Sequence, residues 1–195
     1  MKPALPRSFY ARPTETVARA LVGTILVRLV PGQPARTARI VEVEAYLGPH
    51  DLASHARRGP TPRTSIMFGP PGHLYVYLIY GMYHCMNFVA ERDGEAGAVL
   101  IRAAEPLRGL DEDPRLLAGP GKLCRGLGIT LADKGIDLTS GAGGLFVARA
   151  GRSRPPLARS PRIGVDYAGD WAPRPLRFYV PTSPSVSGPR PKTLR

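Results

Sequence analysis

The sequence predicts an α+β fold: a single mixed domain, residues 1–195, around a mainly antiparallel, curved sheet from which a β-hairpin protrudes. The chain of 195 residues and 21.0 kDa can bury one substantial core but not two large ones. Segments with the pattern of strands outnumber those with the pattern of helices, which favours a sheet as the centre of the domain. Hydrophobic residues make up 43% of the chain, a content that argues against wholesale disorder.

The first thirty residues predict an arm, a helix and a strand. Residues 1–13 are rich in proline and indicate an extended N-terminal arm. Thr14 can cap a helix that ends near Gly23, and Glu15 suits its first turn because the helix dipole favours an acid there. Residues 24–30 then have the composition of a strand.

The densest apolar segment, residues 73–90, predicts a β-hairpin. Two strand-like runs flank Gly81-Met82, where we expect the turn. The remaining elements are expected as strands at 38–46, 96–107, 144–149, 161–165 and 176–180, short helices within 51–60 and 119–129, an irregular charged stretch at 108–118 and a flexible tail at 181–195.

The charge of the chain favours a polyanionic partner. There are 27 Lys+Arg against 15 Asp+Glu, for a formal net charge of +12, and only four of the basic residues are lysines. The surplus lies at the two ends, +4 in residues 1–50 and +7 in residues 151–195. DNA and RNA are the commonest polyanions. GC-rich coding would also produce many arginines, so charge alone does not establish a nucleic-acid partner.

Cysteine and histidine spacing provides no metal motif, and we expect neither a metal nor another cofactor. Cys85 and Cys124 lie 39 positions apart, outside any CxxC pair, and the four histidines lack HExxH spacing. Reduced thiols in a cytosolic chain are the expectation. No apolar stretch is long enough to span a bilayer and no secretory signal is visible, so we expect no membrane association and no secretion.

Two acidic residues in an alternating strand are the first candidates for catalysis. One face of the strand at 38–46 carries Ile40, Glu42, Glu44 and Tyr46, and the other face is apolar. This face is either solvated, as is usual for a surface strand, or borders a pocket in which a carboxylate activates water. The spacing does not choose between these alternatives.

The hairpin supplies further candidates. Tyr80 and Tyr83 flank its turn, where apolar side chains have little to pack against, so we expect a partner surface there. Tyr75 lies further from the turn and is expected in the core. Asn87 is the only asparagine of the chain and is either a structural amide or a ligand-binding one.

Arg102 is unusual because it stands inside an apolar strand, AVLIRAAEPL. A buried guanidinium needs a partner, and Glu44 or Glu42 would serve. The alternative is a surface arginine on an edge of the sheet.

From about Glu15 to Val180 the chain carries, in order, the motifs RIVEVEAYLGPHDLASHARRG, TPR, MFGPPGHLYVYLIYGMYHCMN, AVLIRAAEPL, GPGKLCRGLGI and PLRFYV. Together they resemble the alkyladenine (3-methyladenine, methylpurine) DNA glycosylase family. The resemblance implies a monofunctional glycosylase that excises alkylated and deaminated purines. It also implies a single mixed α/β domain whose hairpin enters the DNA minor groove. None of the four lysines falls in the matched catalytic motifs, so no Schiff-base step is expected.

The resemblance further implies roles for individual residues. Glu44 matches the catalytic general base, and Arg102 and the backbone carbonyl of Ile163 match groups that hold the attacking water. The base pocket would comprise Tyr46, His55 and Tyr77, with Asn87 crowding the 2-amino group of guanine. Toward the DNA, the matched residues are Tyr80 as the side chain that fills the gap in the duplex, Met82 and Tyr83 in the minor groove, and Lys122 near the backbone.

Two other classes of function stay open. A non-catalytic nucleic-acid-binding module would leave the Glu44–Arg102 pair without a purpose, and a hydrolase of free nucleosides would leave the hairpin tip unexplained. Whether these two residues share a pocket under the hairpin separates the alternatives. For the favoured function we expect a monomer that binds double-stranded DNA containing damaged purines. Its place would be the cytoplasm or nucleoid of a bacterium, or the nucleus of a eukaryote.

Overall fold

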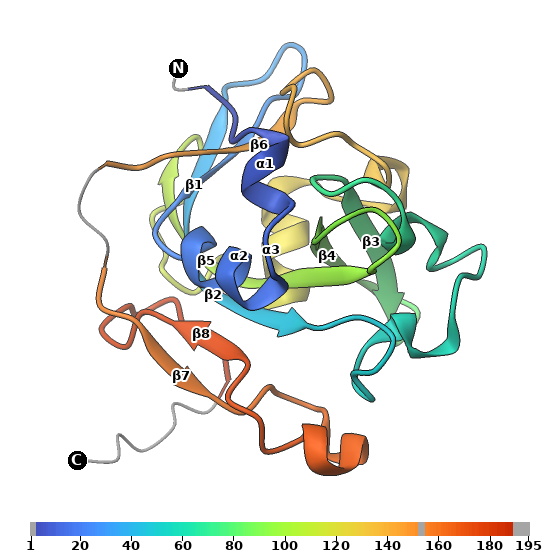
Figure 1. Cartoon of the computed structure of the whole chain (residues 1–195). Helices are drawn as coiled ribbons and strands as arrows, with labels where there is room; N and C mark the ends of the chain where they lie inside the picture. Colours follow the sequence, from blue (N-terminus) through green and yellow to red (C-terminus); the bar gives the residue numbers. More distant parts are fainter. Residues whose placement is uncertain (1–2, 152–154, 189–195) are drawn as a thin grey trace.

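One curled, eight-stranded antiparallel sheet forms the centre of the computed structural model, which describes residues 3–151 and 155–188 (Figure 1). The strands are β1 (Ile25–Arg28), β2 (Arg36–Tyr46), β3 (Leu74–Ile79), β4 (Tyr83–Ala90), β5 (Gly97–Arg108), β6 (Leu145–Ala148), β7 (Ala158–Ser160) and β8 (Arg177–Tyr179). The helices are α1 (Arg7–Tyr10), α2 (Thr14–Leu21) and α3 (Pro120–Leu127), with 3-10 helices η1 (His55–Arg58), η2 (Ser65–Phe68), η3 (Leu131–Asp133) and η4 (Asp166–Trp171). The predicted α+β fold is confirmed.

Strand β2 organises the sheet, whose order is β3-β4-β5-β2-β1-β6. Along one side β2 pairs with β5. On its other side the first residues pair with β1, and Glu42–Glu44 pair with β8, which also pairs with β7. Both acidic residues are therefore enclosed between β5 and β8, in the interior of the sheet rather than at its edge (Figure 1).

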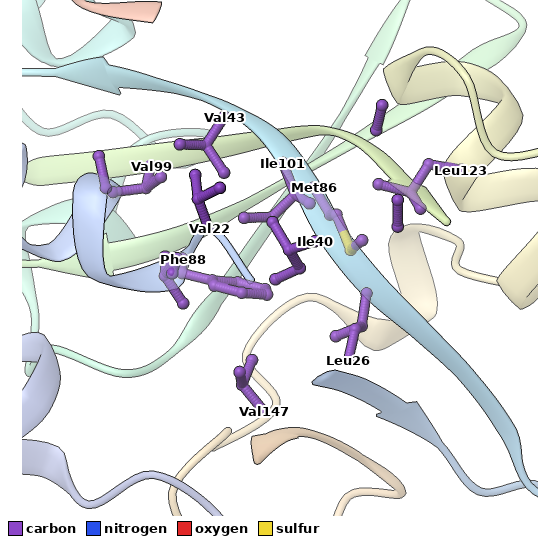
Figure 2. Close-up of a cluster of buried hydrophobic side chains, with 14 of the residues drawn as sticks. Val22, Leu26, Ile40, Val43, Met86, Phe88, Val99, Ile101, Leu123 and Val147 are labelled. Atoms are coloured by element: carbon purple, nitrogen blue, oxygen red, sulfur yellow. The ribbon is translucent and has the colours of Figure 1, made fainter. Parts of the chain in front are cut away.

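The largest hydrophobic core packs helices α2 and α3 against the sheet. Helix α2 buries Val17, Ala18 and Leu21, and α3 buries residues 123, 124 and 127, so each presents one apolar stripe at the spacing i, i+1, i+4. A fully buried leucine stabilises the fold by roughly 1.5–3 kcal/mol relative to an exposed one. Figure 2 shows part of this core, in which the side chains of Val22, Leu26, Ile40, Val43, Met86, Phe88, Val99, Ile101, Leu123 and Val147 gather.

Two bulges between β2 and β5 change which side chains share a face. Val41 on β2 and Arg102 on β5 have no partner in the pairing of the two strands, so each is an extra residue in the ladder. Simple alternation predicts Ile40 on the face of Glu42. Ile40 instead lies in the hydrophobic core (Figure 2). The bulge at Val41 separates the apolar start of β2 from the acidic end.

Most other predicted elements are present. The strands expected at 24–30, 38–46, 96–107, 144–149 and 176–180 and the helices at 14–23 and 119–129 end within two residues of the predicted bounds. The short helix expected within 51–60 is η1. The strand expected at 161–165 is wrong: pairing stops at Ser160, and Pro161, which has no N–H to donate, begins a loop.

The N-terminal segment differs from the expected extended arm. Residues Arg7–Tyr10 form α1, and Leu5 and Tyr10 are buried in the core, because their apolar side chains pack on the sheet despite the neighbouring prolines. Thr14 is not the cap of α2 either. Pro13 takes the N-cap position, and the Thr14 hydroxyl donates to a carboxylate in the β4–β5 loop.

The C-terminal segment also differs from the expectation of a flexible tail at 181–195. Within residues 181–188 the side chains of Ser183, Ser185 and Ser187 are buried. The rest of the predicted tail lies outside the described residues. No helix of the described ranges is long and apolar enough to cross a membrane.

The hairpin is formed by β3 and β4, as predicted, but its loop is one residue longer. Ile79 pairs with Tyr83, which leaves residues 80–82 as the loop. Tyr80 and Gly81 both have positive φ, 54° and 69°, and the Met82 N–H donates to the Ile79 carbonyl. Positive φ at two successive residues is typical of the tight turns that match strand twist, and it is strained for a tyrosine.

Candidate active site

A cavity of about 360 Å³ lies beside the hairpin, within the size range of small-ligand sites. Its walls come from segments far apart in sequence: η1, strands β3, β4 and β5, and the loop after β7. Of the predicted site residues, the cavity is lined by Tyr46, His55, Tyr77, Tyr80, Asn87, Arg102 and Ile163.

Glu44 lies directly behind this lining, with none of its surface exposed. Three lining residues contact its carboxylate. The backbone N–H of Ile163 donates to Oε1 at 2.8 Å, the Tyr46 hydroxyl donates to Oε2 at 2.9 Å, and Arg102 Nη1 lies 3.3 Å from Oε2. The face that carries Glu44 is therefore not solvated, and of the two readings of this strand the structure favours the pocket.

Arg102 is buried rather than exposed at an edge, and it uses both partners that the sequence suggested. Its Nε lies 3.1 Å from Glu42 Oε1, in addition to the contact with Glu44. Burial lowers the pKa of Arg102, but the carboxylates of Glu44 and Glu42 outweigh this effect, and the net pKa is raised. The guanidinium is thus a fixed positive charge at the floor of the cavity.

Aromatic rings form the walls. The ring centroids of His55 and Tyr77 lie 4.6 Å apart, and those of Tyr75 and Tyr77 lie 5.5 Å apart. His55 Nδ1 is 3.0 Å from the Tyr75 hydroxyl. As expected, Tyr75 itself is in the core, only 1% exposed. The edge-to-face contact of His55 with Tyr77, the tilted contact of Tyr75 with Tyr77 and the hydrogen bond fix the orientation of the rings before any ligand enters.

The cavity keeps its aromatic groups uncharged. Burial, and then the positive charges of Arg63 and Arg57, lower the pKa of His55 from 6.5 to about 4. Burial and the nearby Glu44 raise the pKa of Tyr46, and burial also raises that of Tyr77. At neutral pH the walls are therefore neutral rings.

A buried ion pair behind Tyr46 is a feature that sequence reasoning missed. Arg162 and Asp51 make two contacts, of 2.6 and 2.9 Å, and neither side chain is exposed. The Arg162 guanidinium carbon lies 4.7 Å from the centre of the Tyr46 ring, and Nη1 also donates to the Ala45 carbonyl. Arg162 directly precedes Ile163 and packs on the ring of Tyr46. The ion pair therefore supports two of the three residues that contact the Glu44 carboxylate. Asp51 lies within a motif of the resemblance and Arg162 directly precedes the matched residue Ile163, which was the only available signal.

The hairpin tip extends beyond the cavity. Tyr80, Met82 and Tyr83 are 83%, 66% and 46% exposed, as expected for a partner surface. Tyr83 packs against Gly121 of α3 so closely that a β-carbon there would approach its ring to 3.1 Å. Lys122, the next residue, is exposed on α3 and does not line the cavity. Asn87 is 4% exposed and its amide donates to the Tyr75 carbonyl at 3.4 Å.

A second, more basic cavity of about 290 Å³ adjoins the first and shares His55 and Arg63 with it. Arg57 and Arg58 complete its positive lining. Within the residues described, no group of three or more His, Cys, Asp or Glu side chains could hold a metal ion.

Residues 8–184 match a protein-family model described as Methylpurine-DNA glycosylase (MPG). The match covers most of the chain and confirms the resemblance found in the motifs. The chain therefore belongs to the methylpurine-DNA glycosylase family and is an enzyme, a hydrolase of the DNA glycosylase class.

Curated relatives agree with this family. A protein named "Putative 3-methyladenine DNA glycosylase" from Anaeromyxobacter dehalogenans (strain 2CP-C) is 55% identical over 188 residues, which are 96% of this chain and 88% of that protein. Proteins of the same name from Myxococcus xanthus (strain DK1622) and Legionella pneumophila (strain Lens) are 53% and 47% identical. Their matches cover 96% and 94% of this chain and 95% and 97% of theirs.

Proposed function

We propose that this protein removes damaged purines, 3-methyladenine and related alkylated bases among them, from double-stranded DNA by hydrolysis of the N-glycosidic bond. The observation that carries the proposal is the buried Glu44 carboxylate, held by three lining residues at the floor of an aromatic cavity. A base can enter this cavity only if its nucleotide leaves the base stack.

Glu44 acts as the general base in this mechanism. Cleavage of the glycosidic bond builds positive charge on the sugar, which a fixed carboxylate stabilises. The base departs with the bonding electrons, a water oxygen bonds to C1′, and Glu44 accepts the proton of that water. Arg102 and the backbone carbonyl of Ile163 would hold the water. The Ile163 N–H donates to Glu44, which fixes the loop beside the reacting centre.

The walls favour a cationic base. Many alkylated purines carry a positive charge, and the faces of Tyr77 and Tyr46 attract cations. The depressed pKa of His55 keeps its imidazole neutral, so it does not repel such a base. Asn87 is proposed to crowd the 2-amino group of guanine, which would exclude normal guanine.

The surroundings suit duplex DNA. Tyr80 projects from the hairpin as an exposed ring that can fill the gap left by the flipped base, with Met82 and Tyr83 beside it. The arginine-lined cavity and Lys122 would contact phosphates. We propose that the protein acts as a monomer, because one chain supplies both the cavity and the tip.

The test is incubation of the purified protein with duplexes that each carry one defined lesion, such as 7-methylguanine, ethenoadenine or hypoxanthine. We expect strand breaks at the lesion only after alkali, since a hydrolytic glycosylase leaves an intact abasic strand. Strand breaks without alkali would contradict the hydrolytic mechanism. Tight binding without release of any base would contradict the enzymatic function.

A further inference from the structure

A second carboxylate lies beneath the proposed general base and has no part in the mechanism above. Glu42 is fully buried on β2. Its Oε1 accepts from Arg177 Nε at 2.7 Å and from Arg102 Nε at 3.1 Å, and its Oε2 accepts from the backbone N–H of Ser187 at 2.6 Å. Three well-formed contacts on one buried acid indicate that its position is fully specified.

These contacts close into a ring that includes the C-terminal segment. Arg177 Nη2 donates to the Ser187 carbonyl at 2.7 Å, and Arg102 Nη2 donates to the Ser187 hydroxyl at 3.3 Å. Two guanidinium groups and the carboxylates of Glu42 and Glu44 balance in charge, which is the condition for burying them together.

The ring determines how Arg102 approaches Glu44. A free arginine pairs best with a carboxylate through two parallel contacts. Here Glu42 occupies Nε and Ser187 occupies Nη2, so only Nη1 reaches Glu44, at 3.3 Å. A fork-to-fork pair would cover both Glu44 oxygens and pull the guanidinium away from the cavity that it lines.

We propose that Glu42 and Ser187 are positioning residues for base excision: they hold Arg102 side-on to Glu44, so that the guanidinium contacts only one carboxylate oxygen and stays in the lining of the cavity. The proposal rests on the proposed role of Glu44 as general base. It makes residues 181–188 part of the active site, although none of them lines the cavity.

The experiment compares single-turnover excision rates with the affinity for the same damaged duplex. In Glu42→Gln we expect the rate to fall about 100-fold, as for a misplacement near 1 Å, with affinity within twofold of wild type. Ser187→Ala, which removes only the hydroxyl contact, should lower the rate about tenfold. The double variant should be little slower than Glu42→Gln, because both changes release the same guanidinium.

Asp133→Asn is the matched control, since it weakens the largely buried Arg28–Asp133 pair, at 2.8 Å, and neither of these residues lines the cavity. It should lower thermal stability without a change in excision rate. A wild-type rate in Glu42→Gln, or losses of rate and affinity in parallel, would overturn the positioning role. Glu44→Gln, measured alongside, separates this failure from failure of the proposed function: if Glu44→Gln also excises normally, the general base itself is wrong.

Discussion

The cavity has a buried floor and an exposed rim at the hairpin tip, and these two regions are stabilised in opposite ways. At the floor, Glu42 and Glu44 are fully buried and every carboxylate oxygen has a partner. At the tip, Tyr80 is 83% exposed and adopts a positive φ. The floor is ordered before substrate arrives, as catalysis by fixed charges requires. We expect the exposed ring of Tyr80 to gain packing partners from a bound duplex.

Tyrosines show the same contrast within one strand pair. Tyr75 is 1% exposed and its hydroxyl contacts His55, whereas Tyr80, five residues later, is neither buried nor hydrogen-bonded through its side chain within the described part of the chain. Residue type therefore does not distinguish a tyrosine in the cavity wall from a tyrosine proposed to fill the gap in the duplex. Changes at the floor should affect the chemical step and the stability of the fold, and changes at the tip should affect binding.

The largest effect is expected at the floor. Glu44→Gln keeps the shape of the side chain but removes the proton acceptor, so excision should slow by about 100- to 10,000-fold. Affinity for damaged duplex should stay close to wild type. Single-turnover excision and a fluorescence-anisotropy titration measure the two quantities. Wild-type turnover in this variant would refute the assignment of Glu44.

The Arg162–Asp51 pair tests whether the floor also stabilises the fold. Asp51→Ala leaves a buried guanidinium without its partner, which should lower the free energy of unfolding by about 3–5 kcal/mol. Urea denaturation measures this loss. An unchanged midpoint would mean that solvent reaches Arg162, contrary to its burial.

At the hairpin tip, a substitution should weaken DNA binding without lowering the stability of the fold. Tyr80→Ala should weaken damage-specific binding by ~1–3 kcal/mol, the range of a stacking contact. Its unfolding midpoint should not fall, because the ring is exposed. Tyr80→Phe is the matched control and should bind like wild type, since it keeps the ring. Unchanged lesion affinity in Tyr80→Ala would exclude Tyr80 as the side chain that fills the gap in the duplex.

A pH titration probes the wall between these two regions. The pKa of His55 is lowered from 6.5 to about 4 in the folded state, so the unfolded chain binds the proton first as pH falls. The contribution of His55 to stability is complete above pH 6.5 and is lost progressively toward pH 4. His55→Gln should therefore lose less stability than wild type between these values. An imidazole NMR titration with a midpoint near 6.5 would contradict the burial of this ring.

The smallest effect is expected at Asn87. Asn87→Ser shortens the side chain proposed to crowd guanine, so release of guanine from mispairs should rise several-fold, below the roughly 10- to 200-fold that one missing group in a pocket can produce. Excision of an alkylated adenine serves as the internal control and should change little. Equal activity of wild type and Asn87→Ser at guanine mispairs would contradict the proposed role of Asn87 in excluding guanine.

The sequence was most informative about local structure. Alternation over residues 38–46 and the tyrosine-rich hairpin at 73–90 predicted β2, β3 and β4, because period-two patterns specify strands without reference to distant segments. It was less informative wherever distant contacts override composition. Proline content predicted loose ends, yet α1 and residues 181–188 pack against the sheet. The bulge at Val41 was also invisible, because alternation alone places Ile40 with the acids.

What the sequence determined by itself is the family, the strand pattern and the residue types available for catalysis. What only the tertiary structure decided is which residues contact each carboxylate. Glu44 meets Ile163 across 119 positions and Glu42 meets Ser187 across 145. No local pattern encodes such contacts. They exist because β8 and the segments before and after it close against β2, and because a buried acid is stable only where distant donors converge on it.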